Sequence, residues 1–208
     1  MTPPFETIRV RGGRTPFLAR HAARLRRAGA DPGDLAAILA PYRGGEDLVV
    51  RVEADAGGLA VTTRAVPPGG PLQVVVATTP HLPYPHKTTS RSAFAAAAAE
   101  ARAAGADDAL LLTAEGTVAE GTVWSLFWWE PEGLATPALS LGILPGIGRE
   151  RIGEIVPATE RAVRVDALSG RSLFATNAVR GVIEIATLNG EAVPRDARTA
   201  SLAARFWP

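Results

Sequence analysis

Five consecutive residues, Pro67-Pro68-Gly69-Gly70-Pro71, constrain the fold of this chain more than any other segment. Proline lacks the backbone N–H that helices and sheet ladders need, and glycine loses the most conformational freedom when it is ordered. Neither a helix nor a central strand can pass through such a run, so we interpret 67–71 as a linker. The sequence therefore predicts a small domain over residues 1–66 and a larger domain over 72–208.

Both parts are expected to mix helices and strands. In the first part, apolar periodicity predicts a strand over 5–11, helices over 17–28 and from 32 to about 41 with Asp31 as N-cap, and a hairpin of strands 48–54 and 59–66 joined by the turn 55–58. In the second part it predicts helices over 90–104, 147–155 and 196–206, and strands over 72–78, 109–113, 117–119, 122–129, 134–136, 162–165, 173–176 and 182–187. The fold class is accordingly α+β.

Charge and composition exclude several classes of partner. Lys and Arg number 22 against 21 for Asp and Glu, so no strong field favours nucleic acid or an anionic membrane. The absence of cysteine excludes thiolate metal sites, and the longest apolar run, 93–99, is too short to cross a bilayer. The N-terminal residues lack the pattern of a signal peptide. We expect a cytoplasmic protein that binds a small molecule and no metal.

Lys87 is the single lysine among many arginines. A drift toward arginine codons explains why lysine is rare, but it does not explain why one lysine remains where arginine would serve a surface equally well. An amine that must lose its proton and attack a carbonyl cannot be replaced by a guanidinium group. Lys87, in a loop between a predicted strand and helix, is therefore either a lysine left by codon drift or one kept for its chemistry, and a Schiff base with pyridoxal 5'-phosphate (PLP) is the chemistry considered next.

Further residues could supply the rest of a PLP site. Glu120, at the end of a predicted hairpin strand, is either a partner for the pyridine nitrogen or an exposed strand carboxylate. Glycines at 146 and 148 open a helix whose free N–H groups could bind a phosphate. Arg24 could grip the phosphate or form a surface ion pair. The turn at Thr176-Asn177-Ala178 offers backbone and hydroxyl donors, or is a plain Asx turn.

Taken in order, these segments resemble the class IV aminotransferases, a family that includes branched-chain and D-amino acid aminotransferases and aminodeoxychorismate lyase. The resemblance is collinear over nearly the whole chain and rests on the segments 5–10, 21–25, Lys87, 108–112, Glu115-Gly116, Glu120, 126–128, Thr136-Pro137 and 142–149. It implies the two-domain D-amino acid aminotransferase-like fold (PLP fold type IV), with a small α+β domain and a larger β-rich pseudo-barrel domain flanked by helices.

The resemblance also implies roles for individual residues. Lys87 would be the catalytic Schiff-base residue and general acid/base, Glu120 would bind the pyridine nitrogen, and Arg24 would hold the phosphate. Backbone groups of Ile147, Gly148, Asn177 and Ala178 would complete the phosphate cradle. Family members place the substrate site at a subunit interface, so a homodimer is expected.

Within the family, the segments 87–91, 126–128 and 176–178 are most similar to aminodeoxychorismate lyase. This similarity implies release of pyruvate to form 4-aminobenzoate, a step of folate biosynthesis. Residues 53–58 are acidic where the lyases carry arginine and glycine, so Arg51 or Arg91 would bind a dianionic substrate. Two alternatives stay open: a class IV aminotransferase acting on branched-chain or D-amino acids, and a binding module without turnover.

Overall fold

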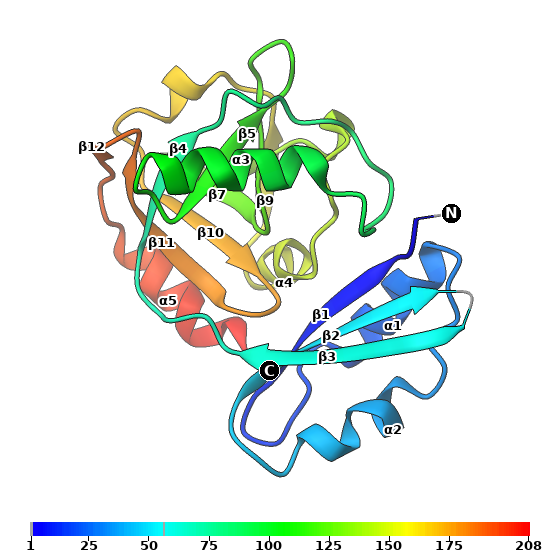
Figure 1. Cartoon of the computed structure of the whole chain (residues 1–208). Helices are drawn as coiled ribbons and strands as arrows, with labels where there is room; N and C mark the ends of the chain where they lie inside the picture. The colour runs from blue at the N-terminus through cyan, green and yellow to red at the C-terminus, as the bar shows by residue number, and fades with distance from the viewer. Residues whose placement is uncertain (1, 56) are drawn as a thin grey trace.

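The computed structural model describes residues 2–55 and 57–208, and it contains two separate β-sheets (Figure 1). Residues 66–71 join the last strand of the first sheet to the first strand of the second and contain no helix or strand. Ala56, in the predicted hairpin turn, and Met1 lie outside the described residues. None of the described helices is long and apolar enough to cross a lipid bilayer.

The first sheet is a three-stranded antiparallel sheet in the order β1-β2-β3. Its strands and the helices that follow or precede them are β1 (Phe5–Val10), α1 (Leu18–Arg27), α2 (Leu35–Leu39), the 3-10 helix η1 (Ala40–Tyr42), β2 (Leu48–Asp55) and β3 (Gly58–Ala65). Side chains alternate between the two faces of each strand. Ile8, Val50 and Leu39 share one buried cluster with the helices, whereas Thr7, Arg51 and other alternate residues face the second sheet and line a cavity.

The start of α2 differs from the expectation. Asp34, and not Asp31, caps the helix, because its carboxylate accepts a hydrogen bond from the N–H of Ala37 at 2.9 Å. Asp31 instead accepts from the N–H of Gly33 at 2.9 Å and closes a separate turn. Gly33 has φ of +53°, outside the helical region, so a helix beginning at Pro32 was wrong.

The second sheet has nine strands in the order β6-β5-β4-β11-β10-β7-β8-β9, with β12 paired to β11. The strands are β4 (Leu72–Val76), β5 (Asp108–Leu112), β6 (Val118–Gly121), β7 (Ser125–Glu130), β8 (Gly133–Pro137), β9 (Ala158–Arg161), β10 (Leu173–Asn177), β11 (Gly181–Leu188) and β12 (Glu191–Ala192). The sheet curls strongly, since the N–H of Val118 at one end donates to the carbonyl of Val163, just after β9 at the other end, at 2.8 Å. This is the β-rich pseudo-barrel that was predicted.

Three α-helices and two 3-10 helices flank the curled sheet: α3 (Ser92–Ala103), α4 (Ile147–Ile155), α5 (Ala197–Phe206), η2 (Leu139–Leu141) and η3 (Val165–Leu168). Figure 1 shows that α3 crosses one side of the sheet, whereas α4 and α5 lie below α3 in this view. The small side chains of Ala97 and Ala101 let α3 lie close to β5. Helices α4 and α5 enclose a second core with Phe127 and Phe174, whose rings stack at 5.3 Å.

Two predicted strands were misplaced. Residues 162–165 form no strand: β9 precedes them, Arg164 makes an isolated bridge to Thr117, and Val163 and Val165 pack against the sheet core. The strand predicted from residue 122 begins at Ser125, because residues 122–124 form a turn in which the N–H of Gly121 donates to the carbonyl of Trp124. The turn 122–124 also forms part of the wall of the cavity that the first sheet lines.

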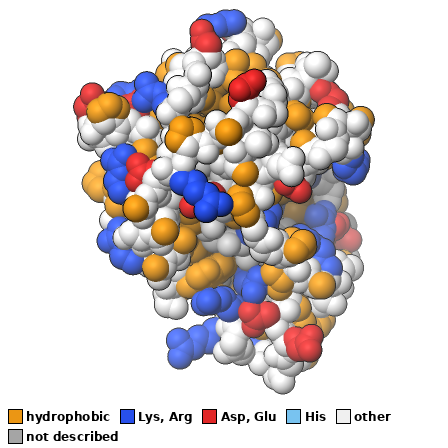
Figure 2. All heavy atoms as spheres, turned by 90° about the vertical axis from the view of Figure 1, so that its left-hand side faces the viewer, with side chains coloured by type: hydrophobic (Ala, Val, Ile, Leu, Met, Phe, Trp, Pro, Cys, Tyr) orange, Lys and Arg blue, Asp and Glu red, His pale blue; other side chains and the backbone are white. Residues whose placement is uncertain are grey.

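The outer surface carries charges of both signs. On the face shown in Figure 2, basic side chains are interspersed with Asp and Glu. Several pair directly, as Arg151 does with Glu154 and Arg198 with Asp196. Mixed charge of this kind creates little long-range attraction for a polyanion.

Candidate active site between the two sheets

A cavity of about 380 Å³ lies between the first sheet and the open side of the curled sheet. It is lined by residues from β1, α1, β2 and β3 on one side and from the loops and strand ends of the second sheet on the other. Every residue predicted for a cofactor or substrate site lies in its lining: Arg24, Arg51, Lys87, Arg91, Glu120, Ile147, Gly148, Asn177 and Ala178. The fold thus gathers into one cavity residues that are spread over more than 150 positions of the sequence.

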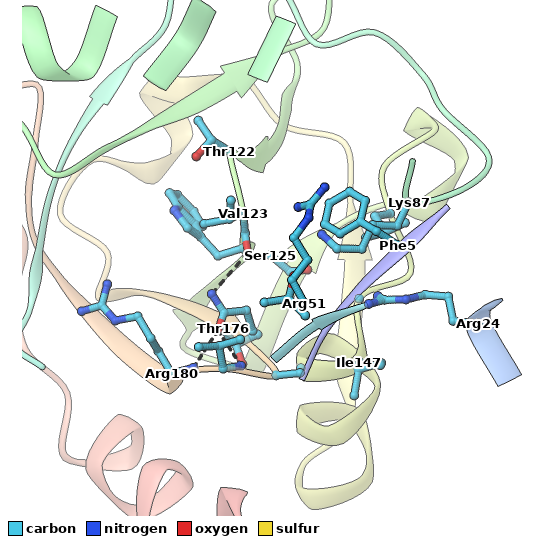
Figure 3. A pocket seen from close by; sticks show the side chains of 18 of the residues that line it. Phe5, Arg24, Arg51, Lys87, Thr122, Val123, Ser125, Ile147, Thr176 and Arg180 are labelled. Atoms are coloured by element: carbon cyan, nitrogen blue, oxygen red, sulfur yellow. Dashed lines mark hydrogen bonds between the residues drawn. The ribbon is translucent and has the colours of Figure 1, made fainter. Parts of the chain in front are cut away.

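Lys87 lies in the loop between β4 and α3, and its backbone is tied to the first strand of the chain. Its carbonyl accepts from the N–H of Phe5 at 3.0 Å, and the N–H of Thr89 donates to the carbonyl of Pro3 at 2.9 Å. These bonds aim the side chain into the cavity, where Nζ lies 4.5 Å from the centre of the Phe5 ring (Figure 3). The loop placement and inward direction agree with the sequence-based expectation.

The environment of Lys87 favours the neutral amine. Burial lowers the pKa of Lys87 to about 7, and the positive charges of Arg24 and Arg91 act in the same direction, against the opposing effect of Glu6 and Glu120. Near neutral pH a large fraction of such an amine is unprotonated and nucleophilic. The side chain can therefore attack a carbonyl and can both take up and return a proton.

Glu120 is buried on β6, and its carboxylate is held from two directions. Oε1 lies 3.0 Å from Nε2 of His81 and accepts from the N–H of Leu144 at 3.3 Å. Both contacts fall on the same oxygen. Tyr84 lies beside the carboxylate; burial and the negative charge of Glu120 raise the pKa of its hydroxyl. Glu120 is thus a fixed buried carboxylate, and the alternative of an exposed strand residue was wrong.

The first turn of α4 packs against the end of β10 at very short range. A Cβ on Gly148 would lie 2.8 Å from Thr176 Oγ1 and 2.9 Å from the backbone nitrogen of Asn177, so only glycine fits. The hydroxyl of Thr176 is buried and has no hydrogen-bond partner among the described residues. The unpaired N–H groups at a helix start and the positive end of its dipole lie beside this hydroxyl, which is an arrangement suited to an anion.

The side chain of Asn177 holds the neighbouring turn together. Its Oδ1 accepts from the N–H groups of Val179 and Arg180, and its Nδ2 donates to the carbonyl of Val123 at 3.2 Å (Figure 3). The Asx turn uses both acceptor positions of Oδ1 and one of the two Nδ2 hydrogens, and it leaves the backbone N–H groups of Asn177 and Ala178 for a ligand. The predicted Asx turn and the predicted phosphate cradle are therefore compatible, since they use different atoms.

Arg24 is anchored by a buried network that the sequence interpretation missed. Its Nε and Nη2 donate to the two carboxylate oxygens of Glu6, each at 2.6 Å, and His21 Nδ1 lies 2.7 Å from Glu6 Oε2. Burial opposes ionisation of Glu6, but His21 and Arg24 outweigh it and lower the pKa of Glu6 to about 2. The spacing of His21 and Arg24, three residues apart on one helix, was the available signal.

Two further arginines of the cavity lining stack on aromatic rings. The Arg51 guanidinium stacks 3.6 Å from the centre of the Phe5 ring and pairs with Glu53. Arg91 donates to the carbonyl of Thr122 and stacks over Phe94. Among the described lining residues, Glu120 is the one carboxylate, whereas five are arginines: Arg24, Arg51, Arg64, Arg91 and Arg180. A bound molecule with several negative charges matches this lining.

The comparisons with known sequences and with solved structures agree on one protein family. Residues 35–188 match the family model of amino-transferase class IV. A curated relative from Thermotoga maritima, named "Probable branched-chain-amino-acid aminotransferase", is 34% identical over 88 residues, which make up 39% of this chain and 32% of that protein. The match to this relative therefore spans about a third of its length.

Solved structures resemble this chain over nearly all of its length. A branched-chain aminotransferase from Thermoproteus uzoniensis, determined with norvaline, has a TM-score of 0.86 and 25% identity over 99% of this chain and 84% of its own. A "putative 4-amino-4-deoxychorismate lyase" has a TM-score of 0.83 and 26% identity, covering 100% of this chain and 90% of its own. An aminotransferase from Brucella abortus with bound PLP has a TM-score of 0.83 at 21% identity, a likeness of fold. This chain belongs to the class IV aminotransferases, a family of PLP-dependent enzymes.

Proposed function

We propose that the cavity holds PLP with its aldehyde at Lys87, its pyridine nitrogen at Glu120 and its phosphate at the first turn of α4. The phosphate would be bound by the N–H groups of Ile147 and Gly148, the Thr176 hydroxyl, the backbone at Asn177 and Ala178, and Arg24. The unpaired Thr176 hydroxyl and the close approach of Gly148 support this placement, because they leave donors without partners where a dianion would accept from them.

Three residues, Glu120, Lys87 and Phe5, would each have a separate role in the reaction. When bound, PLP supplies an aldehyde carbon that takes up an amine and a ring that withdraws electrons from the carbon next to that amine. Glu120 would hold a proton at the ring nitrogen, and the neutral Lys87 amine would accept a proton from the substrate. Phe5, stacked between Arg51 and Lys87, would shield this amine from water.

We infer that the reaction is that of an aminodeoxychorismate lyase, and the cationic lining is the observation that carries this assignment. Arg24 would bind the phosphate. Four arginines of the lining would then be available to a substrate with two carboxylates: Arg51, Arg64, Arg91 and Arg180. Lys87 would take the ring proton next to the amine, and the bond between the ring and the ether oxygen would break as the substrate ring becomes aromatic. The side chain would leave as enolpyruvate, which takes up a proton and becomes pyruvate. Arg51 and Arg91 are the proposed carboxylate contacts.

A class IV aminotransferase is the second candidate. It is favoured by a different observation, the branched-chain aminotransferases among the similar proteins. In that reaction Lys87 would move a proton from the substrate α-carbon, and a 2-oxo acid would be required as acceptor. The cofactor contacts are the same in both reactions, so the substrate contacts distinguish them.

The test is pyruvate release from aminodeoxychorismate without any added 2-oxo acid. The lyase would form pyruvate and 4-aminobenzoate in equal amounts, and Arg51→Met and Arg91→Met should each raise KM about tenfold or more, because each removes a charged contact. If the enzyme releases no pyruvate but transfers the amino group of branched-chain or D-amino acids to 2-oxoglutarate, the aminotransferase is correct.

We further propose that the active form is a homodimer. Val123 lines the cavity and is 58% exposed, and Leu82 is 60% exposed in the loop that leads to Lys87. A second copy that covers these apolar side chains would also close the cavity entrance. Sedimentation should give twice the chain mass, and an active monomer would contradict the proposal.

A further inference from the structure

His81 is a buried residue that lies outside the cavity lining and reaches the site only through its contact with Glu120. It lies in the same loop as Lys87, and its side chain is fully covered. Its backbone N–H donates to the carbonyl of Leu112 at 2.7 Å, at the end of β5. The β5–β6 register places Glu120 opposite Leu111, so this backbone bond brings the His81 ring next to the Glu120 carboxylate.

The hydrogen-bonding pattern of His81 determines its tautomer. Nε2 lies 3.0 Å from Glu120 Oε1, whereas Nδ1 is buried without a partner among the described residues. An N–H at Nδ1 would be a buried donor with no acceptor, which is costly. The pattern therefore favours a neutral ring that donates from Nε2, and this donor leaves the negative charge on Glu120 in place.

The two donors to Glu120 come from different parts of the fold. His81 lies between β4 and α3, and Leu144 lies just before α4. Because both act on Oε1, they restrict rotation of the carboxylate, and neither of them occupies Oε2; the Tyr84 hydroxyl is a further hydrogen-bonding neighbour of this carboxylate. The packing of His81 against Tyr84 and Phe94, at ring-centre distances of 6.0 and 6.2 Å, restricts rotation of the histidine ring itself.

We propose that His81 is a positioning residue, which holds Glu120 by Oε1 so that Oε2 faces the pyridine nitrogen of bound PLP. This inference rests on the proposed placement of the PLP ring at Glu120. The competing interpretation is a histidine that only stabilises the fold. The two interpretations differ in one respect: a positioning residue acts on the ring nitrogen alone, so its effect disappears when the ring has no nitrogen.

The experiment compares PLP with its 1-deaza analogue, in which a C–H group replaces the ring nitrogen. Cofactor-free protein is titrated with each compound, and the dissociation constants are measured without substrate. His81→Phe keeps the ring contacts but removes the donor, and His81→Gln returns an N–H near the position of Nε2. His21→Phe is the matched control, because His21 is equally buried but pairs with Glu6 on the phosphate side.

We expect the parent protein to bind PLP more tightly than the deaza analogue. His81→Phe should weaken PLP binding about tenfold or more, the value typical for loss of a hydrogen bond to a charged group, and should change analogue binding less than about twofold. His81→Gln should restore most of the loss. The control should weaken binding of both compounds alike, because both carry the phosphate.

Two results would overturn the inference alone: PLP binding by His81→Phe as tight as in the parent, or an equal loss for both compounds. If the parent itself binds both compounds equally, the ring does not contact Glu120, and the proposed placement fails together with the inference. Should His81→Phe not fold, His81→Asn replaces it. The shorter amide cannot reach Glu120, and the same selective loss for PLP is expected.

Discussion

Replacing Glu6 by Gln tests the buried network that anchors Arg24. The carboxylate is 1% exposed, and it accepts two hydrogen bonds from Arg24 and one contact from His21. A pKa of about 2, compared with the ordinary value of 4.5, corresponds to about 3 kcal/mol of folding free energy near neutral pH. Loss of the charge leaves a buried arginine without its ion pair, and such losses cost about 3–5 kcal/mol in other proteins.

The assay is urea unfolding of the cofactor-free protein at a series of pH values. The pKa of Glu6 is lower in the folded state, so its contribution is present above about pH 4.5 and is lost as the pH falls toward 2. The stability difference between parent and Glu6→Gln should thus be about 3 kcal/mol at neutral pH and should shrink on acidification. Glu154→Gln is the control, because Glu154 likewise has two basic partners, Arg20 and Arg151, but its side chain is 50% exposed.

The control should cost less than about 1 kcal/mol, as is usual for exposed ion pairs. Glu6→Gln should also weaken PLP binding, since Arg24 would no longer be held toward the phosphate. If Glu6→Gln unfolds at the same urea concentration as the parent at neutral pH, or if the difference does not change with pH, the network does not stabilise the fold as described here.

Three further changes probe the cofactor site. Lys87→Ala should abolish turnover while PLP stays weakly bound, and borohydride reduction of the parent should attach the cofactor to the peptide containing residue 87; normal activity of the variant would disprove the role. Glu120→Gln should bind PLP but turn over about a hundredfold more slowly, since an amide does not keep the ring nitrogen protonated; equal turnover at full occupancy, checked by absorbance, would show that the ring lies elsewhere. Gly148→Ala should weaken PLP binding and cost about 1–3 kcal/mol by forcing α4 away from Thr176, whereas Gly153→Ala, in open space on the same helix, should be neutral or stabilising; similar behaviour of the two would contradict the close packing.

Much of the fold could be predicted because its elements follow local rules. The alternation of apolar residues in β1, β2 and β3 and the alanine-rich pattern of α3 placed these elements within about two residues of their observed ends. Failures occurred where tertiary contacts decided between local options. The apolar residues Val163 and Val165 matched a strand, but the chain uses them to fill the sheet core. The division into domains at 67–71 stays a prediction.

The residues of the candidate site could be predicted from the sequence, but the residues that hold them in place could not. A lone lysine, a glycine-opened helix and the order of motifs along the chain were sufficient to name Lys87, Glu120 and Gly148. No local pattern indicated that Glu120 would be paired with His81, because the two residues are 39 positions apart and meet only through the β5–β6 register. The same holds for Glu6 and Arg24, 18 positions apart on a strand and a helix.

The sequence by itself determined which chemistry is available and where most of the helices and strands form. A single lysine can be the only side-chain amine, and proline and glycine restrict the backbone wherever they occur, so these conclusions depend on no other part of the chain. The protonation of that amine and the anchoring of its neighbours were decided by the tertiary structure alone. Burial and the charges of Arg24, Arg91, Glu6 and Glu120 set the pKa of Lys87, and these groups become neighbours only when the two sheets enclose the cavity.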